Sequence, residues 1–110
     1  NTTTAYDLML VFEAIARGEA IDVISSKKMA DILFKQKHRE MIPALLPDHV
    51  KIANKTGWIT GVHHDSAIIY LPGGRKYVLV LLSKNIKDME KATNMLARAS
   101  LLVYSFMEGN

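Results

Sequence analysis

Three consecutive residues, Lys55, Thr56 and Gly57, combine an ammonium group, a hydroxyl group and a residue without a side chain, and Trp58 follows them. An ammonium group and a hydroxyl group side by side could form one edge of an acyl-transfer site. The triplet also needs an explanation, because glycine weakens a strand. The simpler interpretation is a strand end with a solvated lysine and a turn glycine, because tripeptides of this kind are common by chance.

Two histidines and an aspartate, His63, His64 and Asp65, come shortly afterwards. In an extended chain His63 and Asp65 face one way and His64 faces the other. We predict no metal site, because two ligands on one face are too few for a structural zinc. We expect instead a histidine and the aspartate to form a hydrogen-bonded packing pair. A histidine could also hold an anionic substrate group, but only when protonated, so that binding would depend on pH.

Two serines stand at short spacing from a lysine or an asparagine, and a serine so placed could act in acyl transfer. Ser25 stands three positions before Lys28, and Ser83 stands two positions before Asn85. Local structure accounts for both, since Ser25 is predicted to cap a helix and residues 83–85 to form a turn between a strand and a helix. We therefore expect this chain to lack the nucleophile, and to be inactive alone.

The composition is that of an ordinary globular protein. Of the 110 residues, 49% are hydrophobic and 23% are charged, which excludes a disordered chain. The net charge of +3 comes from 14 basic and 11 acidic residues that are interspersed, so no nucleic-acid surface is predicted. No apolar run reaches the roughly 20 residues that a membrane-spanning helix needs. The sequence has no cysteine, and no cofactor is predicted.

Sequence patterns also predict the elements that position these residues. Thr4 and Asp7 form a variant of the capping box and Gly18 ends the apolar run that follows, which predicts a helix over 5–17. A second helix is predicted from Ser25 or Ser26 to about Lys37. Strands are predicted over 50–55, 66–71 and 76–82, with a hairpin turn at 72–75, and a long helix over 87–107. The expected fold class is α/β of the α+β type: two helices, a three-stranded antiparallel sheet and a C-terminal helix.

The predicted strand at 77–82 is apolar on both faces, which is typical of a strand inside a sheet. An edge strand is usually interrupted by charge, proline or a bulge. The hairpin supplies one neighbour, 66–71. We therefore expect residues 76–82 to pair with a missing N-terminal portion of the protein or with a second copy of the chain.

Taken together, these features resemble the class A β-lactamases and related penicillin-recognising serine hydrolases, in which Lys-Thr-Gly is a known motif. The segments 1–4, 42–47 and 64–70 and the glycines at 73–74 resemble, in order, the parts of that family that flank its Lys-Thr-Gly strand. The resemblance implies the C-terminal portion of a larger enzyme, and an incomplete β-lactamase-like fold. Residues 1–46 would belong to the family's all-α part and residues 47–110 to its α/β part.

The resemblance also implies a role for each residue of the triplet. Lys55 would place positive charge beside the nucleophile and the substrate carboxylate, and the Thr56 hydroxyl would bind that carboxylate. Gly57 would let the strand approach the substrate closely. The backbone N–H of Trp58 would be one donor of the oxyanion hole. The Trp58 side chain would either form an apolar wall over the substrate or pack against the protein.

One departure from the family pattern concerns the arginine that the family often carries on the neighbouring strand to hold the substrate carboxylate. Residues 59–71 contain no arginine. His63 or His64 would have to replace it, or Arg39 would have to reach in. This departure leaves β-lactam specificity open.

The function predicted by resemblance is that of a C-terminal fragment of a serine hydrolase that opens β-lactam rings through an acyl-enzyme. Alternatives are part of a peptidoglycan D,D-peptidase, or part of a catalytically silent relative that binds penicillins or peptidoglycan fragments. The family resemblance implies an exported protein. Because the chain begins at Asn1 without an initiator methionine or a signal peptide, we expect sequence upstream of it.

Overall fold

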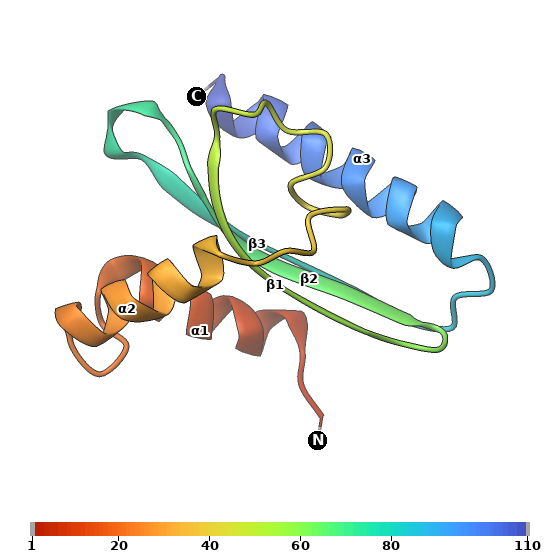
Figure 1. Ribbon diagram of the computed structural model, residues 1–110, viewed down its shortest axis with the longest axis horizontal. Helices are drawn as coiled ribbons and strands as arrows, with labels where there is room; N and C mark the ends of the chain where they lie inside the picture. Colours follow the sequence, from red (N-terminus) through yellow and green to blue (C-terminus); the bar gives the residue numbers. More distant parts are fainter. Residues whose placement is uncertain (1, 110) are drawn as a thin grey trace.

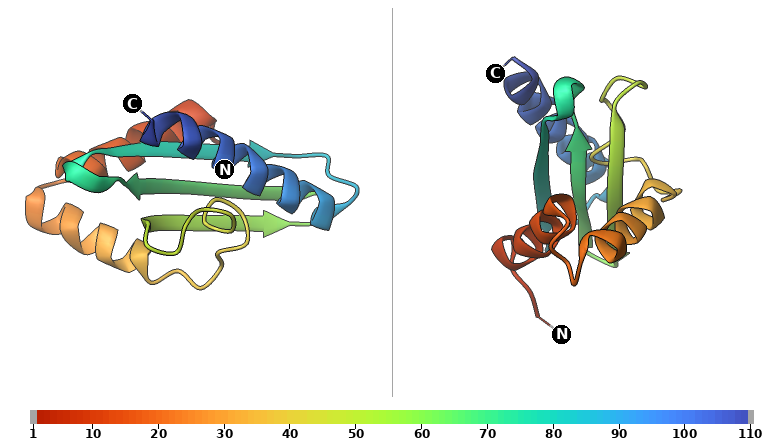
Figure 2. Two further views of the ribbon diagram at one scale, coloured as in Figure 1. Left: turned by 90° about the horizontal axis from the view of Figure 1, so that it is seen from above. Right: turned by 90° about the vertical axis from the view of Figure 1, so that its left-hand side faces the viewer.

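The computed structural model describes residues 2–109. The elements are α1 (Ala5–Arg17), α2 (Val23–Phe34), β1 (Lys51–Ile59), β2 (Val62–Tyr70), β3 (Lys76–Ser83) and α3 (Met89–Glu108), with a 3-10 turn, η1 (Pro72–Gly74), between β2 and β3. The strands form one antiparallel sheet in the order β1-β2-β3. Helix α3 covers one face of this sheet, and α1 and α2 cover the other (Figures 1 and 2). The predicted fold class is confirmed.

Helix α1 begins and ends where the sequence predicts. The Thr4 side chain accepts a hydrogen bond from the Asp7 N–H, which satisfies one of the unpaired donors at the start of the helix. At the other end, Gly18 has a φ of 76° and its N–H bonds to carbonyls of the last turn. This left-handed conformation favours glycine, so the cap explains why the helix stops there.

Helix α2 differs from the prediction at both ends. It begins at Val23 because the Asp22 side chain, and not Ser25, is the cap: Asp22 Oδ1 accepts a hydrogen bond from the Ser25 N–H at 2.7 Å. It ends at Phe34 and not at Lys37. The N–H of Lys35 closes its last turn by bonding to the carbonyls of Ile32 and Leu33.

Strands β1 and β2 extend further toward each other than predicted. Their predicted ends were residues 55 and 66, whereas β1 runs to Ile59 and β2 begins at Val62. A turn of Thr60 and Gly61 connects them, and Gly61 adopts a φ of 78° that other residues disfavour. The Lys-Thr-Gly triplet therefore lies within a paired strand and not at a strand end. The other strand ends and both ends of α3 lie within about two residues of the prediction.

The sheet has an apolar core on each face. Between the sheet and α3 lies a cluster that joins Ile42, Leu46 and Val50 to the strands and to Tyr104. Between the sheet and α1 and α2, Phe12 packs on Ala53 and Ile68. Both faces of the sheet are thus held by helices, which fixes the position of β1.

At the far side of the sheet, β3 pairs with β2, and no other strand among residues 2–109 pairs with it. Its residues from Val78 to Ser83 are only half-buried. Within the same described range, no helix is long and apolar enough to cross a bilayer.

Candidate functional site

The outer edge of β1 carries the Lys-Thr-Gly triplet. β1 is an edge strand of the sheet, and among the described residues β2 is its one partner strand. In an antiparallel ladder, successive residues point their backbone N–H and C=O groups alternately toward the partner strand and away from it. A two-residue turn closes on a hydrogen-bonded pair, here Ile59 and Val62. The backbone groups of Ile59 therefore point toward β2. Those of Trp58 and Thr56, one and three residues earlier, point away from β2 to the outer edge.

The Lys55 side chain supports this assignment independently. Its Nζ donates a hydrogen bond to the Thr56 carbonyl at 2.5 Å, which requires that carbonyl to be accessible. Lys55 lies opposite Ser66 in the register, on the face of the sheet that α1 and α2 cover. The ammonium group is therefore at the outer edge, close to where the Trp58 N–H points.

Gly57 and Thr56 occupy different environments. A Cβ atom added to Gly57 would meet no atom within 4 Å, so the packing of this chain does not itself require a glycine there. The open space is what a closely approaching ligand would need. Thr56 stands opposite Asp65 on the α3 face and is buried. The triplet thus presents Lys55 on one face, Thr56 on the other and the outward backbone between them.

His63 lies opposite Trp58 and is only 6% exposed. Its Nδ1 is 2.9 Å from the Thr93 Oγ1, and that hydroxyl donates to the Met89 carbonyl at 2.8 Å. Because a hydroxyl has a single proton to donate, His63 Nδ1 must be the donor to Thr93. Burial lowers the pKa of His63, so the neutral ring, with Nε2 as acceptor, dominates at neutral pH.

His64 and Arg39 are held elsewhere. His64 stands opposite Gly57 on the other face of the sheet, and its Nδ1 accepts a hydrogen bond from the Ser83 N–H at 3.1 Å. Arg39 Nη1 donates to Asn54 Oδ1 at 3.4 Å. The structure therefore places His63 beside Trp58, His64 beside Gly57, and Arg39 against the residue that precedes Lys55.

A buried polar network behind the triplet was missed by sequence reasoning. Asp65 is fully buried, with Oδ1 accepting from Asn54 Nδ2 at 3.1 Å and Oδ2 accepting from the Ile42 N–H at 3.0 Å. Burial raises the pKa of Asp65 to about 6, although both hydrogen bonds oppose that shift. The expected histidine–aspartate pair is wrong, because Asp65 bonds to Asn54 and Ile42. The signal in the sequence was Asn54, a polar residue within the apolar start of a strand.

The two serine motifs have structural roles. Ser25 lies in the first turn of α2, where its N–H is capped by Asp22. Ser83 Oγ donates to the His63 carbonyl at 2.5 Å, and Asn85 adopts a φ of 60° in the connection to α3. No group of three or more histidine, aspartate or glutamate side chains that could hold a metal occurs in residues 2–109.

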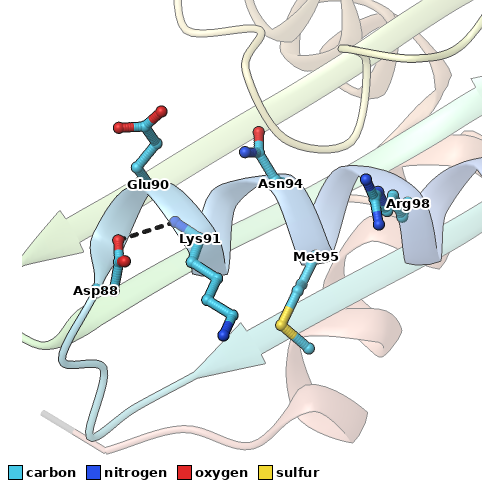
Figure 3. Close-up of a pocket in the computed structure, with 6 residues that line it drawn as sticks. All are labelled: Asp88, Glu90, Lys91, Asn94, Met95 and Arg98. Atoms are coloured by element: carbon cyan, nitrogen blue, oxygen red, sulfur yellow. Dashed lines mark hydrogen bonds between the residues drawn. The ribbon is translucent and has the colours of Figure 1, made fainter.

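A shallow pocket on the outer side of α3 offers no comparable chemistry. Figure 3 shows the residues that line it: Asp88, Glu90, Lys91, Asn94, Met95 and Arg98. The Asp88 side chain is used as the helix cap, since it accepts from the Lys91 N–H at 3.1 Å. Two acidic and two basic side chains lie along this one helix, and such a mixture of charges is typical of a solvated helix face.

Comparisons with known proteins show the family and the fold of the chain. Residues 1–107 match the model of the beta-lactamase enzyme family. The chain belongs to this family. A search of curated proteins found no match.

Solved structures of this type include PBP-A, which is 28% identical and superposes with a TM-score of 0.89 over 100% of this chain and 42% of that one. A mutant of PBP-A, solved as an acyl-enzyme complex with penicillin G, superposes with a TM-score of 0.88 at 28% identity, over the same shares of the two chains. A beta-lactamase from Sphaerobacter thermophilus is 27% identical, with a TM-score of 0.77 over 86% of this chain and 36% of that one. The chain thus spans less than half the length of these relatives.

Proposed function

We propose that this chain supplies the substrate-lining edge of an acyl-transfer site in a penicillin-recognising serine hydrolase, and that the nucleophilic serine comes from the remainder of the protein. The observation that carries the proposal is the outer edge of β1. There the Lys55 ammonium group, the open space at Gly57 and the outward backbone of Trp58 lie next to one another.

In the proposed reaction the serine oxygen attacks the carbonyl carbon of the β-lactam, the ring C–N bond breaks, and the proton lost by the serine hydroxyl passes to the ring nitrogen. The developing oxyanion accepts a hydrogen bond from the Trp58 N–H, a type of interaction worth about 3 kcal/mol. Lys55 provides positive charge beside the nucleophile and the substrate carboxylate, and water then cleaves the acyl-enzyme. Thr56 is assigned to the same carboxylate, which requires its buried hydroxyl to be reached from the outer edge.

The penicillin G acyl-enzyme of the PBP-A mutant supports the substrate class, because that relative superposes on the whole of this chain. One alternative has equal support from the identities, since PBP-A is 28% identical to this chain and the beta-lactamase from Sphaerobacter thermophilus is 27% identical. In this alternative the protein is a peptidoglycan D,D-peptidase that penicillins acylate but that hydrolyses the acyl-enzyme slowly. Both versions of the proposal include export of the protein to the periplasm or the cell exterior.

The test is an assay of the chain alone and after addition of an N-terminal fragment that provides the remaining part of the fold. We expect no nitrocefin hydrolysis by the chain alone. After reassembly we expect either turnover or a penicillin adduct on the added fragment, detected by intact mass. Turnover favours the β-lactamase and a persistent adduct favours the peptidase. Hydrolysis by the chain alone, or neither turnover nor adduct from the folded assembly, would overturn the proposal.

A further inference from the structure

A pocket of about 480 Å³ opens at the tip of the β1–β2 hairpin, on the α3 face of the sheet. The lining residues are Glu40, Trp58, Ile59, Thr60, Gly61, His63, Ile86, Lys87, Met89 and Thr93. Trp58 and Ile59 are 60% and 70% exposed, unusually accessible for large apolar side chains. Ile86, in the connection to α3, and Met89, the first residue of α3, add apolar surface, so the walls of the pocket are mostly hydrophobic.

His63 is a buried polar group within these mostly apolar walls. Its Nδ1 proton is committed to Thr93, which leaves Nε2 as a hydrogen-bond acceptor. Among the described residues, the Tyr77 hydroxyl is the one buried side-chain polar atom that lacks a hydrogen-bond partner. His63 Nε2 is therefore not sealed inside the protein. Since His63 is almost buried and lines this pocket, Nε2 is accessible from the pocket.

The charges around the pocket favour an uncharged occupant. Glu40 and Lys87 contribute one charge of each sign to the lining, and the neutral His63 adds none. A carboxylate would place its own oxygens against an acceptor, Nε2, and Glu40 offsets the positive charge of Lys87. An apolar group with one hydrogen-bond donor matches both the walls and the acceptor.

We propose that this pocket binds an uncharged apolar substituent of the substrate that carries a hydrogen-bond donor, such as a hydroxyphenyl group, with Trp58 as its wall and His63 Nε2 as the acceptor. The assignment to the substrate rests on the proposed function, because Trp58 directly follows the Lys-Thr-Gly triplet. The recognition chemistry of the pocket itself rests only on residues of this chain.

The test uses the full chain and three probes of nearly equal size: 4-methylphenol, 4-methylanisole and 4-methylbenzoate. Trp58 is the one tryptophan in the sequence, so its indole N–H gives a single assignable signal in a proton–nitrogen NMR titration. We expect 4-methylphenol to shift this signal and to bind about tenfold more tightly than either of the other probes, the effect of one hydrogen bond.

Three variants make the result specific to the acceptor. His63→Phe should abolish the preference for the phenol, whereas His63→Gln, which can donate to Thr93 and still offer an acceptor, should retain it. His49→Phe is the control, since His49 is exposed and does not line the pocket. Equal affinity for the phenol and its methyl ether, tightest binding of the benzoate, or a preference that survives in His63→Phe would overturn the proposal.

A second comparison tests the link to the substrate. In the reassembled protein, a penicillin with a 4-hydroxyphenyl side chain should acylate more efficiently than its unsubstituted phenyl counterpart, and His63→Phe should remove that difference. Equal rates for the two penicillins would show that the pocket does not receive the substituent, even where acylation itself occurs. Absence of acylation by both would contradict the proposed function and leave the titration of the chain as a separate measure of the pocket.

Discussion

Asp65 is a buried carboxyl group whose ionisation works against the folded state. Burial raises its pKa to about 6 from an ordinary value of 3.8. A raised pKa means that the folded chain binds the proton more tightly than the unfolded chain. The stabilisation is complete below the unfolded pKa and is lost as pH rises through about 6. A shift of about two units corresponds to about 3 kcal/mol.

We expect the free energy of unfolding to fall by up to about 3 kcal/mol between about pH 4 and pH 7 because of this group. Asp65→Asn should lack that dependence, because an amide does not titrate in this range. The variant also loses one of the two hydrogen bonds, so its stability should be lower at acid pH. Urea unfolding of both proteins across the range measures the difference, and parallel pH profiles would contradict the assignment.

The pKa of His63 shifts in the opposite direction to that of Asp65, since burial lowers it. Glu40 opposes this shift and His64 reinforces it. As pH falls below the ordinary value for histidine, the ring gains a second proton, and Nε2 changes from an acceptor to a cationic donor. Binding of 4-methylbenzoate to the chain should therefore strengthen at acid pH while that of 4-methylphenol weakens. A His63→Phe variant whose benzoate affinity keeps the same pH profile would show that another group is responsible.

Lys55 is expected to matter for chemistry and not for folding. Its side chain is exposed, so Lys55→Ala should change the free energy of unfolding by less than about 0.5 kcal/mol. In the reassembled protein the same change should lower the acylation rate by at least about a hundredfold, the loss typical of an electrostatic contact in the transition state. Lys51→Ala is the matched control, an exposed lysine on the same face of the same strand. Equal effects of the two substitutions on acylation would remove Lys55 from the site.

At the scale of elements, a buried hydrogen bond adds to the apolar contacts that hold α3 on the sheet. Ser100 is fully buried, and its Oγ donates to the Ile42 carbonyl at 2.8 Å, while the Ile42 N–H is held by Asp65. Ser100→Ala should destabilise the chain by about 1–3 kcal/mol, because it leaves a buried carbonyl unpaired. Ser105→Ala, at an exposed serine that bonds only within the helix, should change stability little. Similar unfolding midpoints for the two variants would mean that Ile42 finds another donor.

The elements also show where sequence patterns were sufficient. Helix α1 was predicted because its cap residues lie within one turn of its ends, so the signal is local. The start of α2 was misplaced because two serines match the cap preference as well as Asp22 does, and only geometry decides between them. The predicted strands of the β1–β2 hairpin are too short because residues 58–64 include a glycine and polar residues. Such residues are typical of a connection between strands.

The candidate site was predicted only in part, for a similar reason. The triplet is contiguous in the sequence, so a motif finds it. The Asp65 network joins residues that are 11 and 23 positions apart, and the His63–Thr93 contact spans 30 positions. Such contacts depend on the register of β1 and β2 and on where α3 docks, which no local pattern reports. The division of the chain near residue 46 stays a prediction.

Within residues 2–109, one side of β3 has no partner strand, and the outer surfaces of α1 and α2 are incompletely covered. Val11 on α1 and Ile24 and Ile32 on α2 are all exposed, and β3 is half-buried although its residues are almost all apolar. PBP-A is more than twice as long as this chain, which spans 42% of it. We infer that additional chain covers these surfaces in the intact protein, as the apolar strand at 76–82 predicts.

The chain alone should therefore self-associate through β3, because an apolar strand with unpaired backbone groups adds readily to another strand. Sedimentation velocity at rising concentration should show dimers or larger species, and Val80→Lys should shift them toward monomer by placing a charge on that strand. Val11→Lys tests the competing contact, since it places the same charge on the exposed surface of α1. Adding the N-terminal fragment should dissolve the assemblies, because its strand would occupy the same edge. Two outcomes would show that the chain does not associate through β3. In one the chain remains monomeric at high concentration, and in the other the assemblies respond to Val11→Lys and not to Val80→Lys.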